Sequence, residues 1–356
     1  MTDAVFAKDF PDRTAAMGEV RGHRLIKHRL SVPRLHGLHD GPDGSQVVFD
    51  DVFAQGRCEL LLGDLIALAD RDPSHIPRLV KLVEAVCHDL TTAFTHERRY
   101  PLSSCVPTLY ADRIRPGGRL DTWYLNPGHS VVPAGGNVPA LTVADLADHT
   151  ITVNDRPLTI NLPDIVRTTR QILTPDSSWV CGHTQGDPTE PNIADPLCWL
   201  DFALAGLNTL PGEAANLLWY LMGLGGWLVP TYQPDTYHRT MRLALPPLTT
   251  PRITHLDHHP RLRHLDIHYQ WNTGPGRRAA LTTALRALPD IPWHDLRPFL
   301  TLRVLGVVRP WTFTTTDTLL TLIKAAELHQ TSSNATEFFT QHTFERSSRE
   351  PRPPHH

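Results

Sequence analysis

The chain has 356 residues, of which 40% are hydrophobic and 20% charged, which is enough for one large domain or a two-lobed unit. Its 34 basic and 37 acidic side chains give a net charge of -3, so no broad positive field attracts nucleic acid or an anionic membrane. The sequence has no signal-peptide pattern and no membrane-spanning apolar run, and its five cysteines are scattered, which predicts a cytoplasmic protein with reduced thiols.

The first fifty residues predict a strand, a helix and a hairpin. Residues 4–10 are short and apolar and are followed by Pro11, which is typical of a strand. Residues 12–30 begin with an aspartate suited to an N-cap and have amphipathic spacing, which predicts a helix. Residues 32–38 and 45–50 predict two strands, because a turn rich in Asp, Gly and Pro separates them.

Helical patterns dominate the next part of the chain. Residues 59–69 and 76–94 have apolar side chains at helical spacing. Residues 100–140 are rich in Pro and Gly and lack periodicity, which predicts irregular loops that act as a lid or a substrate wall. Residues 150–162 predict a further hairpin, and residues 164–173 predict a helix.

The last part of the chain predicts a strand followed by helices. A short strand begins at residues 179–181, and residues 213–228 predict a buried helix that is too short and Gly-interrupted to cross a membrane. Residues 278–288 and 316–329 predict two more helices. Residues 347–356 are rich in Pro, Arg and His and predict a frayed tail.

The segment between the predicted strand and the buried helix carries the chemistry. Asp187 follows a glycine, Asn192 lies five positions later, and Asp201 follows a further apolar stretch. Phosphoryl transfer needs a carboxylate to accept a proton from the attacking hydroxyl and oxygen ligands to hold Mg²⁺ on the phosphates. These three side chains supply both types, and a hairpin would bring them together. The simpler alternative for Asp187 is a solvated Gly-Asp-Pro turn.

This segment resembles the aminoglycoside phosphotransferase and choline kinase superfamily, whose loop reads His-Gly-Asp-x-x-x-x-Asn and whose metal acid follows in Ile/Leu-Asp-Trp/Phe. The upstream order is similar too. Lys8 resembles the family's phosphate-binding lysine, Glu19 resembles its helix partner, and residues 49–52 resemble the adenine-binding hinge. The resemblance covers roughly residues 4–225.

The resemblance implies an α+β fold of the bilobal protein-kinase type. It implies a truncated N-terminal β-lobe on the nucleotide side at residues 1–55, a large helical C-terminal lobe with the catalytic and metal loops at residues 56–343, and a disordered tail at residues 344–356. It also implies an enzyme that uses ATP and Mg²⁺ to phosphorylate a hydroxyl of a small molecule, such as an aminoglycoside-like antibiotic, an amino alcohol or a sugar. No nucleic-acid or membrane partner is expected, and the sequence does not indicate an oligomeric state.

Each candidate residue takes its role from the resemblance. Asp187 would orient the acceptor hydroxyl and accept its proton, and Lys8, fixed by Glu19, would contact the phosphates. Backbone groups near Asp50 and Val52 would hold adenine. The predicted site comprises Asp187 for catalysis, Asn192 and Asp201 for Mg²⁺, and Lys8, Glu19, Asp50 and Val52 for the nucleotide.

Departures from the family pattern leave a second function open. The residues before Lys8 are too few for the two strands and the Gly-rich loop that cover the phosphates. Either the true start lies upstream, or the protein is a catalytically impaired pseudokinase that acts as a binding or scaffold module.

Gln185 replaces the usual histidine, although its amide can still fix the loop. Glu213 and Asn216 are imperfect substitutes for an aspartate expected near the next helix. A protein kinase is disfavoured, because its His-Arg-Asp and Asp-Phe-Gly motifs are absent.

Five histidines gather between His255 and His268. Imidazoles bind transition metals, but neither cysteines nor a His-Glu-x-x-His pattern accompanies them, so a polar, solvated loop is expected. Asp257 and Asp266 in the same segment would suit a cationic amine acceptor or would lie on the surface as solvated carboxylates.

Overall fold

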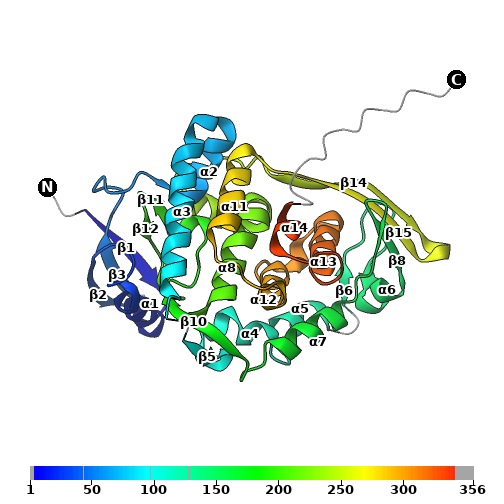
Figure 1. Cartoon of the computed structure of the whole chain (residues 1–356), viewed down its shortest axis with the longest axis horizontal. Coiled ribbons are helices and arrows are strands. Elements are labelled where there is room, and N and C mark those ends of the chain that lie inside the picture. Colours follow the sequence, from blue (N-terminus) through cyan, green and yellow to red (C-terminus); the bar gives the residue numbers. More distant parts are fainter. Residues whose placement is uncertain (1–3, 43, 97, 127–128, 341–356) are drawn as a thin grey trace.

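The structure is a computed structural model that describes residues 4–42, 44–96, 98–126 and 129–340. Within these ranges the chain forms many helices and five small sheets, which is an α+β arrangement. Figure 1 shows the N-terminal sheet at one end of an elongated molecule, helices in the middle and a long hairpin at the other end. The predicted tail at 344–356 lies outside the described residues. None of the described helices is both long and apolar enough to cross a membrane.

The N-terminal sheet has three antiparallel strands in the order β1-β3-β2, with one helix against it. The elements are β1 (Val5–Phe10), α1 (Arg13–Ile26), β2 (Leu35–Gly41) and β3 (Gly44–Asp50). The Asp12 carboxylate caps α1 by accepting a backbone N–H at 2.9 Å, as its position before the apolar spacing predicted. The strand, the helix and the hairpin predicted for this part of the chain are therefore confirmed.

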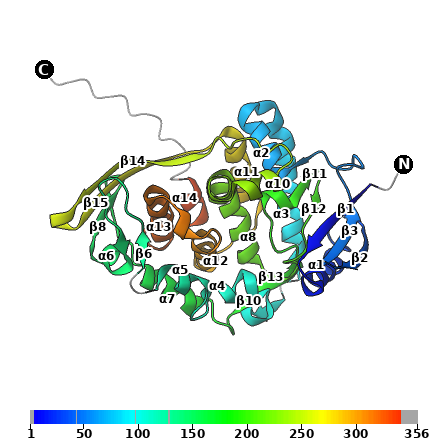
Figure 2. The same cartoon turned by 180° about the vertical axis from the view of Figure 1, so that it is seen from behind.

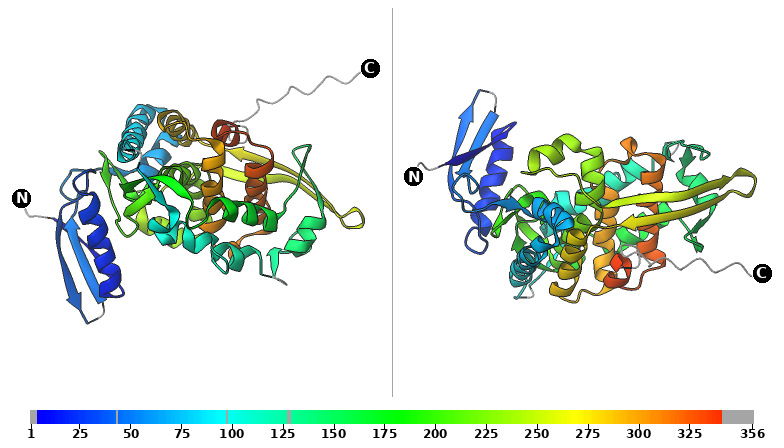
Figure 3. Two further views of the ribbon diagram at one scale, coloured as in Figure 1. Left: turned by 60° about the horizontal axis from the view of Figure 1, so that its bottom comes forward. Right: turned by 90° about the horizontal axis from the view of Figure 1, so that it is seen from above.

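This N-terminal unit has a small hydrophobic core of its own, separate from the main core. Figure 3 shows its sheet and helix side by side at the end of the molecule. The buried side chains of α1 face those of β3, because the helix is apolar on one stripe and the strand on alternate residues. The buried ring of Phe202, which lies far along the chain, also packs in this core and so connects the N-terminal unit to the rest of the molecule. The members of this core are Ala16, Val20, Ile26, Val47, Phe49 and Phe202.

The main core lies among the helices in the middle of the molecule. Helix α11 packs against α2 and α3, and α12 packs against both α8 and α13. Helix α8 continues into a π-helical stretch, η5 (Tyr220–Leu228), so the predicted buried helix at 213–228 is confirmed, and Trp219 and Trp227 are core residues. The helices of this layer are α2 (Leu62–Arg71), α3 (Ile76–Ala93), α7 (Leu162–Ile172), α8 (Leu210–Trp219), α9 (Val229–Tyr232), α10 (Pro234–Thr240), α11 (Pro275–Ala287), α12 (Trp293–Gly306), α13 (Thr315–Gln330) and α14 (Ala335–Thr340).

Residues 100–140 are more ordered than their sequence predicted. They form short helical turns and strands, and two of their rings, Tyr110 and Tyr124, are fully buried. Each piece is shorter than two helical turns, so hydrophobic periodicity could not reveal it. The elements here are β5 (Arg99–Pro101), η2 (Leu102–Ser104), η3 (Pro107–Leu109), α4 (Ala111–Ile114), α5 (Arg119–Tyr124), β6 (Ser130–Val132) and β7 (Leu141–Thr142).

The histidine-rich segment forms a long hairpin, and the prediction of a polar loop there is wrong. Strands β14 (Thr250–His259) and β15 (His264–Asn272) pair antiparallel and extend away from the helices, as Figure 2 shows from behind. Alternate residues of β15 are buried while the histidines between them face outward, so the segment has the period-2 pattern of a half-buried strand. Strand β15 also pairs with β8 (Thr150–Val153), which pairs with β9 (Arg156–Leu158).

The remaining short elements surround the candidate site or connect the layers. They are β4 (Leu60–Leu61), η1 (Pro73–His75), α6 (Val143–Asp148), β10 (Ser178–Thr184), η4 (Glu190–Asn192), β11 (Ile193–Asp195), β12 (Cys198–Trp199), β13 (Gly206–Thr209), η6 (Pro260–Leu262) and η7 (Pro310–Thr312). They form two three-stranded sheets of order β13-β10-β5 and β12-β11-β4.

Candidate active site

The turn after β10 places Asp187 at the junction between a strand and a loop. Gly186, which precedes it, has a φ of +87°, in the left-handed region that L side chains rarely adopt. A Cβ atom at Gly186 would also lie 2.0 Å from the carbonyl oxygen of Leu204. Only glycine therefore lets the chain turn closely enough here to point Asp187 toward the loop that follows.

Two amides hold the half-buried carboxylate of Asp187. Asn192 donates from Nδ2 to Asp187 Oδ2 at 3.0 Å and also to the Asp187 carbonyl oxygen at 3.0 Å. Asn216, on α8, donates from Nδ2 to Asp187 Oδ1 at 2.8 Å. Because each carboxylate oxygen accepts from a different amide, the plane of the carboxylate is fixed. The structure thus brings Asp187 and Asn192 together across their five-residue spacing.

Gln185 joins the loop of Asp187 to the loop of Asp201. Its Oε1 accepts from the Asp187 backbone N–H at 2.8 Å. Its Nε2 donates to the carbonyl oxygen of Leu200 at 2.9 Å and to that of Asp201. The side chain is only 1% exposed, so these bonds form where water cannot compete. The prediction that an amide at this position fixes the loop through the backbone is confirmed.

A second charged group links the N-terminal sheet to the same loop. Lys8 Nζ lies 3.0 Å from Glu19 Oε2 and 3.0 Å from Asp201 Oδ1. The other oxygen of Glu19, Oε1, accepts from the backbone N–H of Phe202 at 3.0 Å. Burial raises the pKa of Glu19, and the neighbouring charge of Asp201 raises it further. The first strand, the first helix and a loop almost two hundred residues later therefore meet at one ammonium and two carboxylates.

Asp201 has the features of a solvent-facing metal ligand. Its backbone lies in the left-handed region with a φ of +56°, and its side chain is 44% exposed. Asn192 uses its Nδ2 to bind Asp187, so within the described residues no hydrogen bond engages its Oδ1 oxygen. Carboxylate and amide oxygens are the ligands that Mg²⁺ prefers, and it usually takes one or two carboxylates beside substrate phosphates. By type these donors suit Mg²⁺, whereas the described residues contain no group of three or more His, Cys, Asp or Glu side chains that could hold a metal ion.

Asp50 and Val52 form a separate cluster. The Asp50 carboxylate accepts from His36 Nε2 at 2.7 Å and from Arg57 at 3.2 Å. The carbonyl oxygen of Val52 accepts backbone N–H groups from Arg57 and Cys58 at 2.9 and 3.0 Å. In the described parts of the chain, no hydrogen bond or ion pair connects Asp50 or Val52 to the residues around Asp187. Their role with adenine stays a prediction.

Comparison with known proteins gives similarity to solved structures, two of which follow. No protein-family model and no curated protein sequence matches the chain. The structure is similar to the aminoglycoside phosphotransferase APH(3'')-Id from Streptomyces rimosus, with a TM-score of 0.35 and 14% identity over 83% of this chain and 86% of that one. It is also similar to a glucosamine kinase, with a TM-score of 0.35 and 15% identity over 88% of this chain but only 63% of that one. At these values neither likeness identifies a substrate or an active residue.

Three buried charged side chains around Asp187 were not predicted as site residues. Arg113 and Arg303 are 7% and 3% exposed, and the charge of each favours the ionised form of Asp187. Burial is nevertheless the largest effect on Asp187 and raises its pKa. Glu213, on α8, is completely buried. Arg303 lies on α12, more than a hundred residues after Asp187, so no local pattern could have indicated it.

Glu213 makes the stability of the protein depend on pH. Burial is the largest effect and raises its pKa from 4.5 to about 7, and the nearby Thr184 hydroxyl and Gly186 backbone oppose this rise only in part. Between pH 4.5 and 7 the folded protein holds a proton that the unfolded chain releases, so stability falls as pH rises through this window. The loss amounts to about 3 kcal/mol above pH 7.

We expect Glu213→Gln to remove this loss, because the amide carries no charge to bury. Thermal unfolding of the parent and the variant from pH 4 to pH 8 measures the difference. The variant should gain stability relative to the parent as pH rises. The exposed Glu84→Gln is the matched control and should follow the parent at every pH. Parallel curves for parent and Glu213→Gln would contradict the assignment.

Proposed function

We propose that the chain is a kinase-like phosphotransferase that moves the γ-phosphoryl group of Mg·ATP to a hydroxyl of a small molecule. The main support is the fixed carboxylate of Asp187, which Asn192 and Asn216 hold at both oxygens. The Lys8–Glu19–Asp201 group provides a cation and a metal-binding carboxylate on a neighbouring loop. A positioned base, an oxygen donor set for Mg²⁺ and a lysine are the parts that phosphoryl transfer requires.

In this proposal Asp187 accepts the proton of the acceptor hydroxyl. Each carboxylate oxygen that binds an amide still has a lone pair for that hydroxyl. The two amide bonds restrict the rotation of the side chain, so the attacking oxygen would be held in one orientation. Burial raises the pKa of Asp187 above its usual range, which makes the carboxylate a stronger base than a solvated one.

The nucleotide would lie beside Lys8 and Asp201. Lys8 would contact phosphate oxygens while its bond to Glu19 keeps the ammonium in place. Asp201 and Asn192 would hold Mg²⁺, which when bound neutralises the negative charge of the phosphates. The backbone around Asp50 and Val52 would contact adenine, with the Val52 N–H as the available donor, since the carbonyl oxygen is already bonded twice.

A two-lobed kinase-like fold accounts for the separate cores. The unit of β1, β2, β3 and α1 would be the nucleotide lobe, and the helical layer would be the second lobe, with the boundary predicted between residues 55 and 56. The small core and the main core support this division. Glu19, which binds the backbone of Phe202, would connect the two lobes at the site.

Binding of Mg·ATP, measured by calorimetry, tests the nucleotide part of the proposal. We expect Lys8→Met to weaken binding at least tenfold, because a hydrogen bond to a charged group contributes about 1.5–3 kcal/mol. Lys81→Met removes an equally charged but exposed side chain on α3 and should leave the affinity unchanged. If the parent protein does not bind Mg·ATP, the chain instead serves as a binding or scaffold module.

The acceptor class comes from the sequence resemblance. A panel of aminoglycosides, amino alcohols and sugars, assayed for ADP release, would identify the hydroxyl that is phosphorylated. Nucleotide binding without turnover on any member of the panel would also favour the scaffold module.

A further inference from the structure

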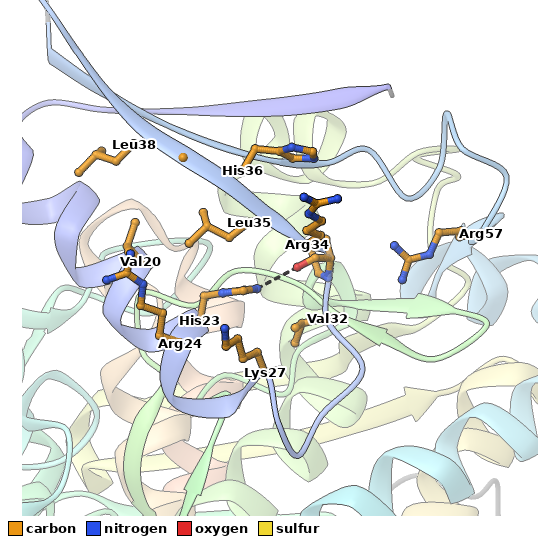
Figure 4. A pocket seen from close by; sticks show the side chains of 12 residues that line it. Val20, His23, Arg24, Lys27, Val32, Arg34, Leu35, His36, Leu38 and Arg57 are labelled. Atoms are coloured by element: carbon orange, nitrogen blue, oxygen red, sulfur yellow. Dashed lines mark hydrogen bonds between the residues drawn. The ribbon is translucent and has the colours of Figure 1, made fainter. Parts of the chain in front are cut away.

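A pocket of about 570 Å³ opens on the N-terminal unit between α1 and the edge strand β2 (Figure 4). Figure 4 shows Arg24 and Lys27 from the end of α1 on one side of this pocket and Arg34 and His36 from the strand side on the other. Arg57 approaches from the loop after β3. This volume lies in the range of small-molecule sites.

The pocket carries a strong local positive charge. None of its lining residues is acidic, and in the described parts of the chain the side chains of Arg24, Lys27 and Arg34 take part in no ion pair or hydrogen bond. The carboxylate of Asp50, which is not part of the lining, binds His36 and Arg57 and also accepts the Arg34 backbone N–H at 3.4 Å. Three exposed cations thus line one concave space with no ion-pair partner among the described residues, in a protein whose net charge is -3. Such an arrangement concentrates anions.

The lining between these cations is apolar. Val20 and Leu35 line the pocket, as does Leu38 farther along β2. Near them, His23 donates from Nε2 to the carbonyl oxygen of Pro33 at 2.8 Å. A ligand that fits this site would therefore be small and would carry more than one negative group where it meets the cations.

We propose that this pocket binds a small phosphorylated ligand with at least two negative charges. Arg24 and Lys27 would bind it from the helix and Arg34 from the strand, and guanidinium groups match phosphate oxygens through paired hydrogen bonds. The pocket lies apart from Lys8, which is on β1 at the opposite edge of the β1-β3-β2 sheet, and it adjoins Asp50, whose carboxylate binds His36 and Arg57 of the lining. The ligand would bridge α1 and β2 and hold the helix that carries Glu19 against the sheet.

Pyrophosphate is a suitable probe, and Lys8→Met is a suitable background because it removes the cation of the proposed nucleotide site. We expect pyrophosphate to bind this protein in calorimetry and to slow amide hydrogen exchange in α1 and β2. Arg24→Gln together with Lys27→Gln should weaken binding more than tenfold, since each lost charge-assisted bond contributes over 1 kcal/mol. Arg21→Gln with Arg29→Gln removes the same charge from exposed positions outside the pocket and should change affinity less than twofold.

The same variants distinguish a free ligand from a lipid headgroup. Phosphatidylcholine vesicles containing phosphatidic acid replace pyrophosphate in a sedimentation assay. Vesicle binding that the Arg24/Lys27 variant loses and the Arg21/Arg29 variant keeps would support the pocket and identify a headgroup as the source of phosphate. Absence of binding to both probes would overturn the proposal. Equal losses of affinity in both variants would also overturn it. They would show that binding depends on the overall positive charge of the protein and not on this pocket.

Discussion

Replacing Asp187 with asparagine should lower kcat for phosphoryl transfer by a factor of about 10²–10⁴, with a much smaller effect on the KM for ATP. A positioned general base typically contributes this much, and an amide cannot accept the hydroxyl proton. The nucleotide contacts proposed for Lys8 and Asp201 do not involve Asp187, so ATP affinity should be kept. Initial rates with the best acceptor of the panel, at several ATP concentrations, separate the two parameters.

Asp176→Asn is the matched control for this variant. Asp176 is exposed and lies before the same strand, β10, so the same chemical change there should leave kcat unaltered. An asparagine at position 187 presents one oxygen where the carboxylate presents two, so it loses the bond from Asn192 or Asn216. Thermal unfolding should accompany the kinetics. An unchanged kcat in a folded Asp187→Asn protein would remove Asp187 from the catalytic role.

The sequence could predict the parts of the site that lie on one continuous segment. Asp187 and Asn192 are five residues apart in one tight loop, so their contact follows from local geometry. The pairing of Lys8 with Glu19 was also predictable, because a strand followed directly by a helix places the two side chains on adjoining surfaces. The structure brings these residues together, and their roles in catalysis and nucleotide binding stay predictions.

Other contacts at the site depend on long-range packing that no local pattern shows. Asn216 reaches Asp187 only because α8 passes beneath the loop, and Arg303 comes from α12, which packs against α8. The sequence indicated Asn216 only as a poor substitute for an expected aspartate. Its amide nevertheless suits this position, because the carboxylate oxygen of Asp187 needs a hydrogen-bond donor. The histidine-rich hairpin was missed for another reason. Its alternation was hidden, because histidine occupies outward positions on both β14 and β15.

Replacing Arg277 with methionine should destabilise the protein by about 3–5 kcal/mol, because it leaves the carboxylate of Glu190 buried without its partner. Arg277, on α11, is 3% exposed and Glu190 is 2% exposed. Arg277 Nη2 donates to Glu190 Oε2 at 3.1 Å, and Nη1 donates to Glu190 Oε1 and to the Leu221 carbonyl oxygen. The main chain at Gly225 packs directly against this pair, since a Cβ atom there would lie 2.3 Å from Glu190 Oε1.

The consequence for function follows from the position of Glu190, two residues before Asn192 in the same loop. Denaturant unfolding should show the loss in Arg277→Met, and Arg277→Met with Glu190→Gln should recover part of it, because the double variant buries no charge. Arg286→Met is the matched control on α11. Its partner Glu84 lies 4.0 Å away and both side chains are exposed, so the change should cost less than about 1 kcal/mol. If Arg277→Met and Arg286→Met lose the same stability, the buried pair does not anchor the loop that carries Asp187 and Asn192.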